Sequence, residues 1–189
     1  MSGEHTSLNI ALIHWPVYDS NKNIVCTNVT NFDIHDIARA GRTYGVDKYF
    51  IVNRMKEQLS FVARVLEHWR TGWGSQYNPT RKAALQNVEL AETLEDVLKT
   101  FPQKPLIVCT SARDLGIPRV SFPELRKKIW DPATPPILLV FGTGFGLDPS
   151  ILQQADMLLE PLKGASKDNW RHLSVRSAVS IILDRLMHT

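Results

Sequence analysis

The chain has 189 residues, 43% of them hydrophobic, and a formal net charge of +3 at pH 7. Its length supports one sizeable core, and the lack of any apolar run of about 18 residues excludes a transmembrane helix. The two cysteines, Cys26 and Cys109, have no C-x-x-C spacing, so a disulfide framework and a structural zinc site are not indicated. The first residues lack the features of a secretory signal peptide. We therefore expect one cytoplasmic domain over residues 1–189 that binds no metal.

Short apolar runs and longer amphipathic segments alternate along the chain, which predicts strands and helices in turn. The predicted strands span residues 10–13, 49–52, 88–90, 106–108, 137–141 and 157–159. The predicted helices span residues 34–44, 59–69, 94–101, 122–130 and 175–187. This alternation favours parallel strands joined by helical crossovers, so we expect an α/β fold with a single doubly wound parallel sheet. The continuous apolar run 137–141 is typical of a central strand covered on both faces.

Basic and aromatic side chains gather in the first half of the chain. Arg39 and Arg42 lie three residues apart on one face of a predicted helix. Residues 71–81 include two glycines and a proline, so we predict a functional loop that carries Trp73 and Tyr77 and ends at Arg81. Guanidinium groups can hold phosphates, and aromatic rings can stack on unpaired bases. This combination favours an RNA-facing surface, and an ordinary solvated surface is the alternative.

Polar segments follow three of the predicted strands, where ligands bind in an open parallel sheet. Thr110 and Ser111 follow the strand 106–108, a turn of alternating glycines follows the strand 137–141, and a long polar loop leads to a helix that Ser174 can cap. The glycine turn lacks the dinucleotide pattern G-x-G-x-x-G and the Lys-Ser/Thr pair of a phosphate-binding loop, which argues against a nucleoside triphosphatase. Together the segments predict a pocket for a nucleotide-like cofactor. For the glycine turn alone, a plain strand-to-helix connection is the alternative.

The order and spacing of these segments resemble the cofactor-binding end of the SPOUT class of RNA methyltransferases. The resemblance rests on ILLVFGTGFGL and LLEPLKGASKDNWRHLSVRSAVSIILDRL and covers the chain from Cys109 onward. It implies a C-terminal trefoil knot, a homodimer and S-adenosylmethionine (SAM) as the cofactor, although knots are rare among folds. The cofactor-binding residues that it implies are Thr110, Ser111, Gly142, Thr143, Gly144, Gly146, Leu159, Pro161, Leu162, Gly164, His172, Leu173, Ser174 and Val175.

A second segment, DIHDIARAGRTYGVDKYFIV, is similar to the N-terminal motif of the ribose-methylating members of this class. Arg39 and Gly45 match the arginine and the glycine of that motif, whereas Asp33 stands where the motif begins with asparagine. The class often has a glutamate in the glycine turn and asparagine and serine in the final motif, where this chain has Gly144, Ser174 and Arg176. These departures imply a divergent, stand-alone member.

The resemblance implies methyl transfer from SAM to a tRNA or rRNA nucleotide, at either the base or the ribose. Transfer from a sulfonium depends mostly on holding the acceptor and the methyl group in line. We assign Arg39 as the catalytic cation that acts on ribose or phosphate. The predicted RNA-binding residues are Arg42, Trp73, Tyr77 and Arg81. A noncatalytic RNA-binding module that keeps the pocket and another nucleotide-cofactor enzyme are the alternatives.

Several other titratable side chains receive no functional assignment from the sequence. Asp33, His35 and Asp36 are possible bases, but the two carboxylates also suit the first turn of a helix, where they complement the helix dipole. His14 follows the first predicted strand and His68 lies late in a predicted helix, and we interpret both as structural.

Overall fold

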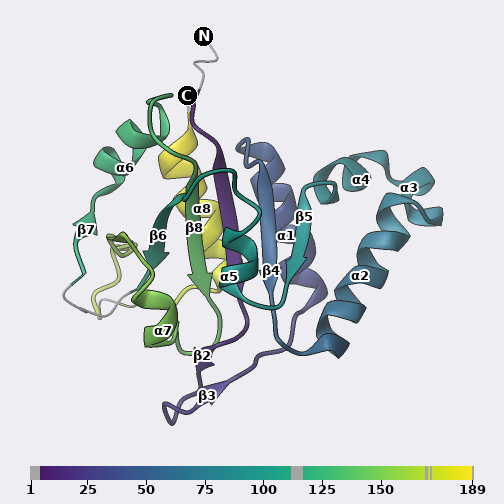
Figure 1. Ribbon diagram of the computed structural model, residues 1–189, viewed down its shortest axis with the longest axis horizontal. Coiled ribbons are helices and arrows are strands. Elements are labelled where there is room, and N and C mark those ends of the chain that lie inside the picture. Colours follow the sequence, from purple (N-terminus) through teal and green to yellow (C-terminus); the bar gives the residue numbers. More distant parts are fainter. Residues whose placement is uncertain (1–4, 112–116, 169, 171, 189) are drawn as a thin grey trace.

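The computed structural model describes residues 5–111, 117–168, 170 and 172–188, and it contains one seven-stranded sheet (Figure 1). The strand order is β5-β4-β1-β8-β6-β9-β7, and every neighbouring pair runs parallel. These strands are β1 (Leu8–Ile13), β4 (Lys48–Val52), β5 (Val88–Ala91), β6 (Leu106–Thr110), β7 (Arg119–Val120), β8 (Ile137–Gly142) and β9 (Met157–Leu159). A separate antiparallel hairpin pairs β2 (Val17–Tyr18) with β3 (Ile24–Val25).

Helices cover both faces of the sheet, as the alternation in the sequence predicts (Figure 1). The core on one face includes side chains of α1 (Asn31–Thr43), α2 (Lys56–Arg70), α4 (Pro79–Leu85), α6 (Phe122–Ile129) and α8 (Val175–Met187). The core on the other face includes side chains of α5 (Leu94–Leu98) and α7 (Pro149–Leu152). The predicted doubly wound α/β sheet is therefore confirmed. None of the described helices has the length and apolar character needed to cross a membrane.

The central strands β1 and β8 are buried on both faces, which explains their continuous apolar sequences. Along β1, Leu8, Ile10 and Leu12 belong to one core, whereas Ala11 and Ile13 belong to the other. β4 and β5 lie on one side of β1, and β8, β6, β9 and β7 lie on the other, so the direction of winding reverses beside β1. Ligands bind beyond the carboxyl ends of strands at such a reversal. The residues that follow β1 and β8 are therefore placed to form a site.

Residues 71–81 do not form the predicted loop, and that prediction was wrong. They make up α3 (Trp73–Tyr77), which lies at the outer end of α2 in Figure 1, and the first turn of α4. The side chain of Asn78 accepts a hydrogen bond from the backbone N–H of Arg81 and caps α4, and Pro79 occupies its first position. Glycine and proline were taken as helix breakers, but here Gly72 precedes one helix and Pro79 starts the next.

Several element boundaries also differ from the predicted ones. α1 begins at Asn31 rather than at residue 34, because Thr30 and Asp33 form a capping box, each side chain accepting from the other's backbone N–H. α5 ends at Leu98 rather than at residue 101. The elements β2, β3, β7 and α7 are too short for periodicity to predict. The predicted knot depends on the path of the chain through residues 112–116, 169 and 171, which lie outside the described residues, and it stays a prediction.

Candidate active site

A cavity of about 450 Å³, here called the larger cavity, lies beyond the carboxyl ends of β1 and β8. It is bordered by the ends of these strands and of β6, the segment that leads into α1, the glycine turn after β8 and the start of α8. Its lining residues are His14, Thr27, Asn28, Asp33, Thr110, Phe141, Gly142, Thr143, Gly144, Leu173, Ser174, Val175 and Ala178. Hydroxyls, an imidazole and a carboxylate therefore line it together with apolar groups.

A smaller cavity of about 190 Å³ adjoins the larger one. Thr110, Leu173 and Ala178 line both cavities, so the two share a wall. The other lining residues of the smaller cavity are Ser111, Leu159, Glu160, Pro161, Leu162 and Ile182. Most of these side chains are apolar, so the smaller cavity suits a flat, mainly apolar group such as a nucleobase.

The three polar segments that the sequence analysis selected meet at these two cavities. Of the predicted cofactor-binding residues, the larger cavity is lined by Thr110, Gly142, Thr143, Gly144, Leu173, Ser174 and Val175. The smaller cavity adds Ser111, Leu159, Pro161 and Leu162. Gly146, Gly164 and His172 line neither of the two cavities. The contacts of all these residues with a cofactor stay a prediction.

The turn after β8 needs glycine for its backbone shape and its packing. Gly144 and Gly146 have φ angles of +57° and +110°, a region that favours glycine. A Cβ atom on Gly144 would lie 2.6 Å from the backbone oxygen of Tyr18 in β2, and one on Gly142 would lie 2.9 Å from Cγ of Leu147. These contacts are with the protein itself. Gly142 and Gly144 therefore shape the wall of the larger cavity through contacts within the protein.

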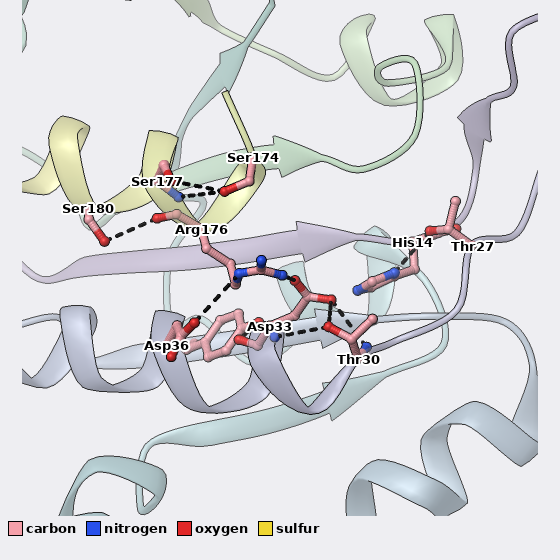
Figure 2. Close-up of polar contacts among 10 residues, drawn as sticks. His14, Thr27, Thr30, Asp33, Asp36, Ser174, Arg176, Ser177 and Ser180 are labelled. Atoms are coloured by element: carbon pink, nitrogen blue, oxygen red, sulfur yellow. Dashed lines mark hydrogen bonds and ion pairs between the residues drawn. The ribbon is translucent and has the colours of Figure 1, made fainter. Parts of the chain in front are cut away.

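Asp33 is buried, and its carboxylate is held from two sides (Figure 2). Oδ2 accepts hydrogen bonds from the hydroxyl and the backbone N–H of Thr30, at 2.6 and 3.1 Å. Oδ1 lies 3.3 Å from Nη1 of Arg176 in α8. Arg176 also places its Nε 3.5 Å from Oδ2 of Asp36 and lies over the ring of Phe32. The first turn of α8 is thereby fastened to the first turn of α1 beside the larger cavity.

His14 directly follows β1 and is buried in the wall of the larger cavity. Its Nδ1 lies 2.9 Å from Oγ1 of Thr27 (Figure 2), and its Nε2 has no hydrogen-bond partner among the described residues. Burial lowers the pKa of His14 from 6.5 to about 4, against a smaller opposing effect of the Asp33 carboxylate. The imidazole is therefore neutral at physiological pH. The sequence analysis interpreted His14 as structural, although it follows a central strand just as Thr110 and Gly142 do.

Arg39 and Arg81, predicted from separate segments, both lie near His35 of α1. The guanidinium of Arg81 stacks over the ring of Trp69, 4.5 Å from its centroid, and His35 makes an edge contact with the same ring, with 5.8 Å between centroids. Burial and the positive charge of Arg81, followed by that of Arg39, lower the pKa of His35, while Asp36 opposes them. Helices α1, α2 and α4 thus bring His35, Trp69 and Arg81 together, with the charge of Arg39 close enough to act on His35.

The remaining residues predicted to face RNA are exposed. Trp73 and Tyr77 of α3 are 67% and 71% exposed, and their rings stack on each other with 4.9 Å between centroids and 19° between planes. Arg39 and Arg42 are exposed on α1 and line neither of the two cavities. The predicted RNA-facing residues are therefore separate from the predicted cofactor-binding residues, and their contact with RNA stays a prediction.

The sequence of this chain is similar to those of known proteins. Residues 7–188 match the profile of a family described as SAM-dependent RNA methyltransferase. The chain is 42% identical over 187 residues to an uncharacterized protein of Aquifex aeolicus, a match that covers 94% of this chain and 86% of the relative. It is 38% identical over 185 residues to a tRNA (guanine-N(1)-)-methyltransferase of Nitratidesulfovibrio vulgaris. That match covers 96% of this chain but 42% of the relative, so the chain spans less than half the length of that enzyme.

Solved structures share the fold at low sequence identity. A probable methylase family protein from Haemophilus influenzae has a TM-score of 0.63 at 19% identity, over 96% of this chain and 64% of that one. The SpoU methyltransferase AviRb from Streptomyces viridochromogenes has a TM-score of 0.57 at 13% identity, over 98% of this chain and 60% of that one. These likenesses confirm the predicted SPOUT-like fold.

Proposed function

The chain belongs to the family of SAM-dependent RNA methyltransferases, and from this premise we propose that it methylates a tRNA or rRNA nucleotide at the two adjoining cavities. The observation that carries this proposal is the convergence of the segments after β6, β8 and β9 on cavities that share Thr110, Leu173 and Ala178. A cofactor and an acceptor in cavities with a common wall lie side by side. Methyl transfer from a sulfonium depends mainly on such placement.

We assign the smaller cavity to the adenosine part of SAM. Leu159, Pro161, Leu162 and Ile182 give it the apolar lining that a nucleobase requires. When bound, SAM supplies a methyl group that is activated by its positively charged sulfur. In this proposal the methionine part of SAM extends along the predicted cofactor-binding residues of the larger cavity. We place the acceptor nucleotide in the same cavity, because its hydroxyls and its buried, unpartnered imidazole nitrogen suit a polar occupant.

RNA, in this proposal, lies over α1, α3 and α4. Positive charge for the phosphate backbone comes from Arg39, Arg42 and Arg81. The exposed, stacked rings of Trp73 and Tyr77 offer a flat face on which an unpaired base can stack. Arg39 belongs to α1, the helix that also contributes to the wall of the larger cavity. We therefore keep Arg39 as the cation that acts on a ribose or phosphate of the bound RNA.

We also propose that the chain is one domain that acts in the cytoplasm as a knotted homodimer, as the resemblance to the SPOUT class implies. The many apolar residues of α8 do not by themselves support the dimer, because Val179, Ile182, Leu183 and Leu186 are buried inside the protomer. Phe32 and Leu173, near the starts of α1 and α8, remain exposed. A second protomer that covers them would complete the site. Light scattering that shows a monomer at micromolar concentration would contradict the dimer.

Calorimetric titration tests the cofactor assignment. The wild-type protein should bind SAM and its demethylated product, with NAD and ATP much weaker. Ala178→Met should weaken SAM binding roughly tenfold or more, because the larger side chain fills the wall that both cavities share. Ile181→Met, on the more exposed side of the same helix, is the matched control and should bind SAM as the wild type does. Unchanged SAM binding by Ala178→Met, or equal binding of NAD by the wild type, would contradict the assignment.

A further inference from the structure

His14 combines deep burial with an unused acceptor in the wall of the larger cavity. The side chain is 1% exposed, and its Nε2 has no hydrogen-bond partner among the described residues. Buried polar groups in native proteins nearly always have a partner, so an orphan of this kind marks a place where a ligand group completes the structure. The other ring nitrogen is fixed by Thr27 (Figure 2). The nitrogen without a partner, Nε2, thus belongs to a side chain that lines the larger cavity.

A chain of short contacts links Nδ1 of His14 to two hydroxyls and a backbone oxygen. Oγ1 of Thr143 lies 3.0 Å from the backbone oxygen of Ile13, which also accepts from the backbone N–H of Thr143. When the Thr143 hydroxyl donates to Ile13, the Thr27 hydroxyl supplies the proton of the 2.6 Å contact between the two threonines. Nδ1 of His14 then donates to Thr27 across 2.9 Å. In this arrangement Nε2 holds a lone pair and no proton.

The carboxylate of Asp33, which lines the same cavity, already has partners at both of its oxygens. Asp33 accepts from Thr30 through one oxygen and pairs with Arg176 through the other. Among the described titratable side chains that line the larger cavity, His14 therefore offers the unused acceptor. Nε2 of His14 is therefore the group to examine as an acceptor for a proton that leaves an occupant of this cavity.

We infer that His14 is a catalytic residue whose Nε2 accepts the proton of the hydroxyl or N–H group that attacks the methyl carbon. The inference rests on the proposed function and specifies the acceptor as an atom that carries a proton before transfer. As the lone pair of the acceptor forms its bond to the methyl carbon, the carbon–sulfur bond breaks and its electron pair stays on sulfur. The proton of the acceptor moves to Nε2 and later to water. Thr27 and Thr143 are positioning residues, because their hydroxyls hold the proton of His14 on Nδ1.

His14 does not need to be a strong base for this reaction. The acceptor atom becomes positive as the methyl group arrives, and a methylated hydroxyl that still holds its proton is a far stronger acid than imidazolium. An imidazole with a pKa of about 4 can therefore take that proton. The same low pKa keeps the ring neutral beforehand, so the ring adds no positive charge near the sulfonium. The charged groups that face the ring are Asp33 of α1 and, paired with it, Arg176 of α8.

Nitrogen-15 NMR of the histidine rings tests the position of the proton without cofactor or RNA. His14→Gln identifies the signals of His14 by their loss. At pH 7 we expect the neutral tautomer with the proton on Nδ1, and protonation of Nε2 only as the pH approaches about 4. Thr27→Val, which removes the acceptor of Nδ1, should weaken this preference. A proton on Nε2, or a charged ring at pH 7, would overturn the inference.

Methyl transfer to total RNA from a strain that lacks this protein tests the catalytic role. His14→Gln keeps an acceptor near the position of Nε2 but cannot take a proton, so kcat should fall roughly 100-fold or more. SAM affinity and Tm at pH 7.5 should stay near the wild-type values. The matched control is His5→Gln, because the ring of His5 packs against Trp130 before the start of β1, at the opposite edge of the sheet. It should keep the wild-type kcat.

The possible failures of this experiment are distinguishable. If the wild type transfers no methyl group to any RNA, the proposed function fails and the inference fails with it. If the wild type is active and His14→Gln keeps kcat within about threefold, only the inference fails. A loss of kcat in His14→Gln with SAM binding intact supports both.

Discussion

Asp33 and Arg176 lie 143 positions apart in the sequence and form an ion pair, with 3.3 Å between Oδ1 and Nη1. Each departs from the pattern of the SPOUT class, and the sequence presents them as two separate changes. In the structure the two departures form one interaction, because the charge of Arg176 balances that of Asp33. The pair joins α1, the helix that carries Arg39, to α8, the helix that follows the last of the polar segments. It therefore links the proposed RNA side of the site to the proposed cofactor side.

Arg176→Gln should lower the free energy of unfolding by about 2 kcal/mol, because the buried Asp33 carboxylate loses its charged partner. Urea denaturation at pH 7.5 measures this change. Lys99→Gln, which breaks the exposed pair of Lys99 and Asp96, is the control and should change stability much less. The loss in an Asp33→Asn/Arg176→Gln double variant should fall short of the sum of the single losses by about 1 kcal/mol or more. Additive losses would mean that the two side chains act independently.

Gly144→Ala should destabilise the turn after β8. A positive φ of +57° costs alanine roughly 1 kcal/mol, and the new Cβ would lie 2.6 Å from the backbone oxygen of Tyr18. We expect a loss of about 2 kcal/mol in thermal or urea unfolding. Gly41→Ala is the matched control, since its Cβ would meet Val46 at an ordinary 3.4 Å inside α1, where alanine favours the helix by up to about 1 kcal/mol. Similar losses in the two variants would be inconsistent with this view of the turn.

Trp73→Ala and Tyr77→Ala should each weaken RNA binding, because each removes one ring of the exposed stack on α3. A base stacked on an aromatic ring contributes about 1–3 kcal/mol in other single-strand binders, so the dissociation constant should rise roughly fivefold or more. Fluorescence anisotropy with bulk tRNA measures it, and calorimetry should show unchanged SAM binding. Ile24→Ala, an exposed apolar side chain of β3, serves as the control. If both variants bind RNA with the wild-type affinity, Trp73 and Tyr77 do not contact RNA and the prediction is contradicted.

The buried His14 should make stability depend on pH. Its pKa is about 4 in the folded chain and 6.5 when the chain is unfolded, so between these values the unfolded state binds more protons. Stability is therefore highest above pH 6.5 and falls as the pH drops toward 4, by about 2 kcal/mol between pH 7.5 and 5 from this group alone. His14→Gln removes this pH-dependent loss of stability. In urea unfolding, the free energy of unfolding of the variant should therefore rise relative to that of the wild type when the pH is lowered from 7.5 to 5. A stability difference that stays the same at both pH values would show that His14 titrates normally.

The sheet and its helices could be predicted because their signal is local. β8 is buried on both faces, so its sequence is an unbroken apolar run. α8 is buried on one face, so its apolar residues recur with helical spacing. The convergence of Thr110, Gly142 and Ser174 could be predicted as well, because parallel strands bring their carboxyl ends to one edge.

The features that the sequence did not predict depend on distant partners. The free nitrogen of His14 exists because Thr27 and Thr143 occupy the other side of the ring, and no spacing in the sequence expresses that contact. The helix at residues 79–85 forms because Asn78 caps it and Pro79 suits its first position. The helix at residues 73–77 has no side-chain cap and contains Gly74. Local propensity alone therefore favoured a loop.

The central claim is that this chain binds SAM at the two adjoining cavities and transfers its methyl group to RNA. The most direct test incubates the protein with SAM that carries a labelled methyl group and total RNA from a strain that lacks the protein, followed by digestion and separation of the nucleosides. We predict label in a methylated nucleoside of tRNA or rRNA with the wild type, and little or none with Ala178→Met, which fills the shared wall. Label that is absent from every nucleoside with the wild type, or that appears equally with Ala178→Met, would contradict the account.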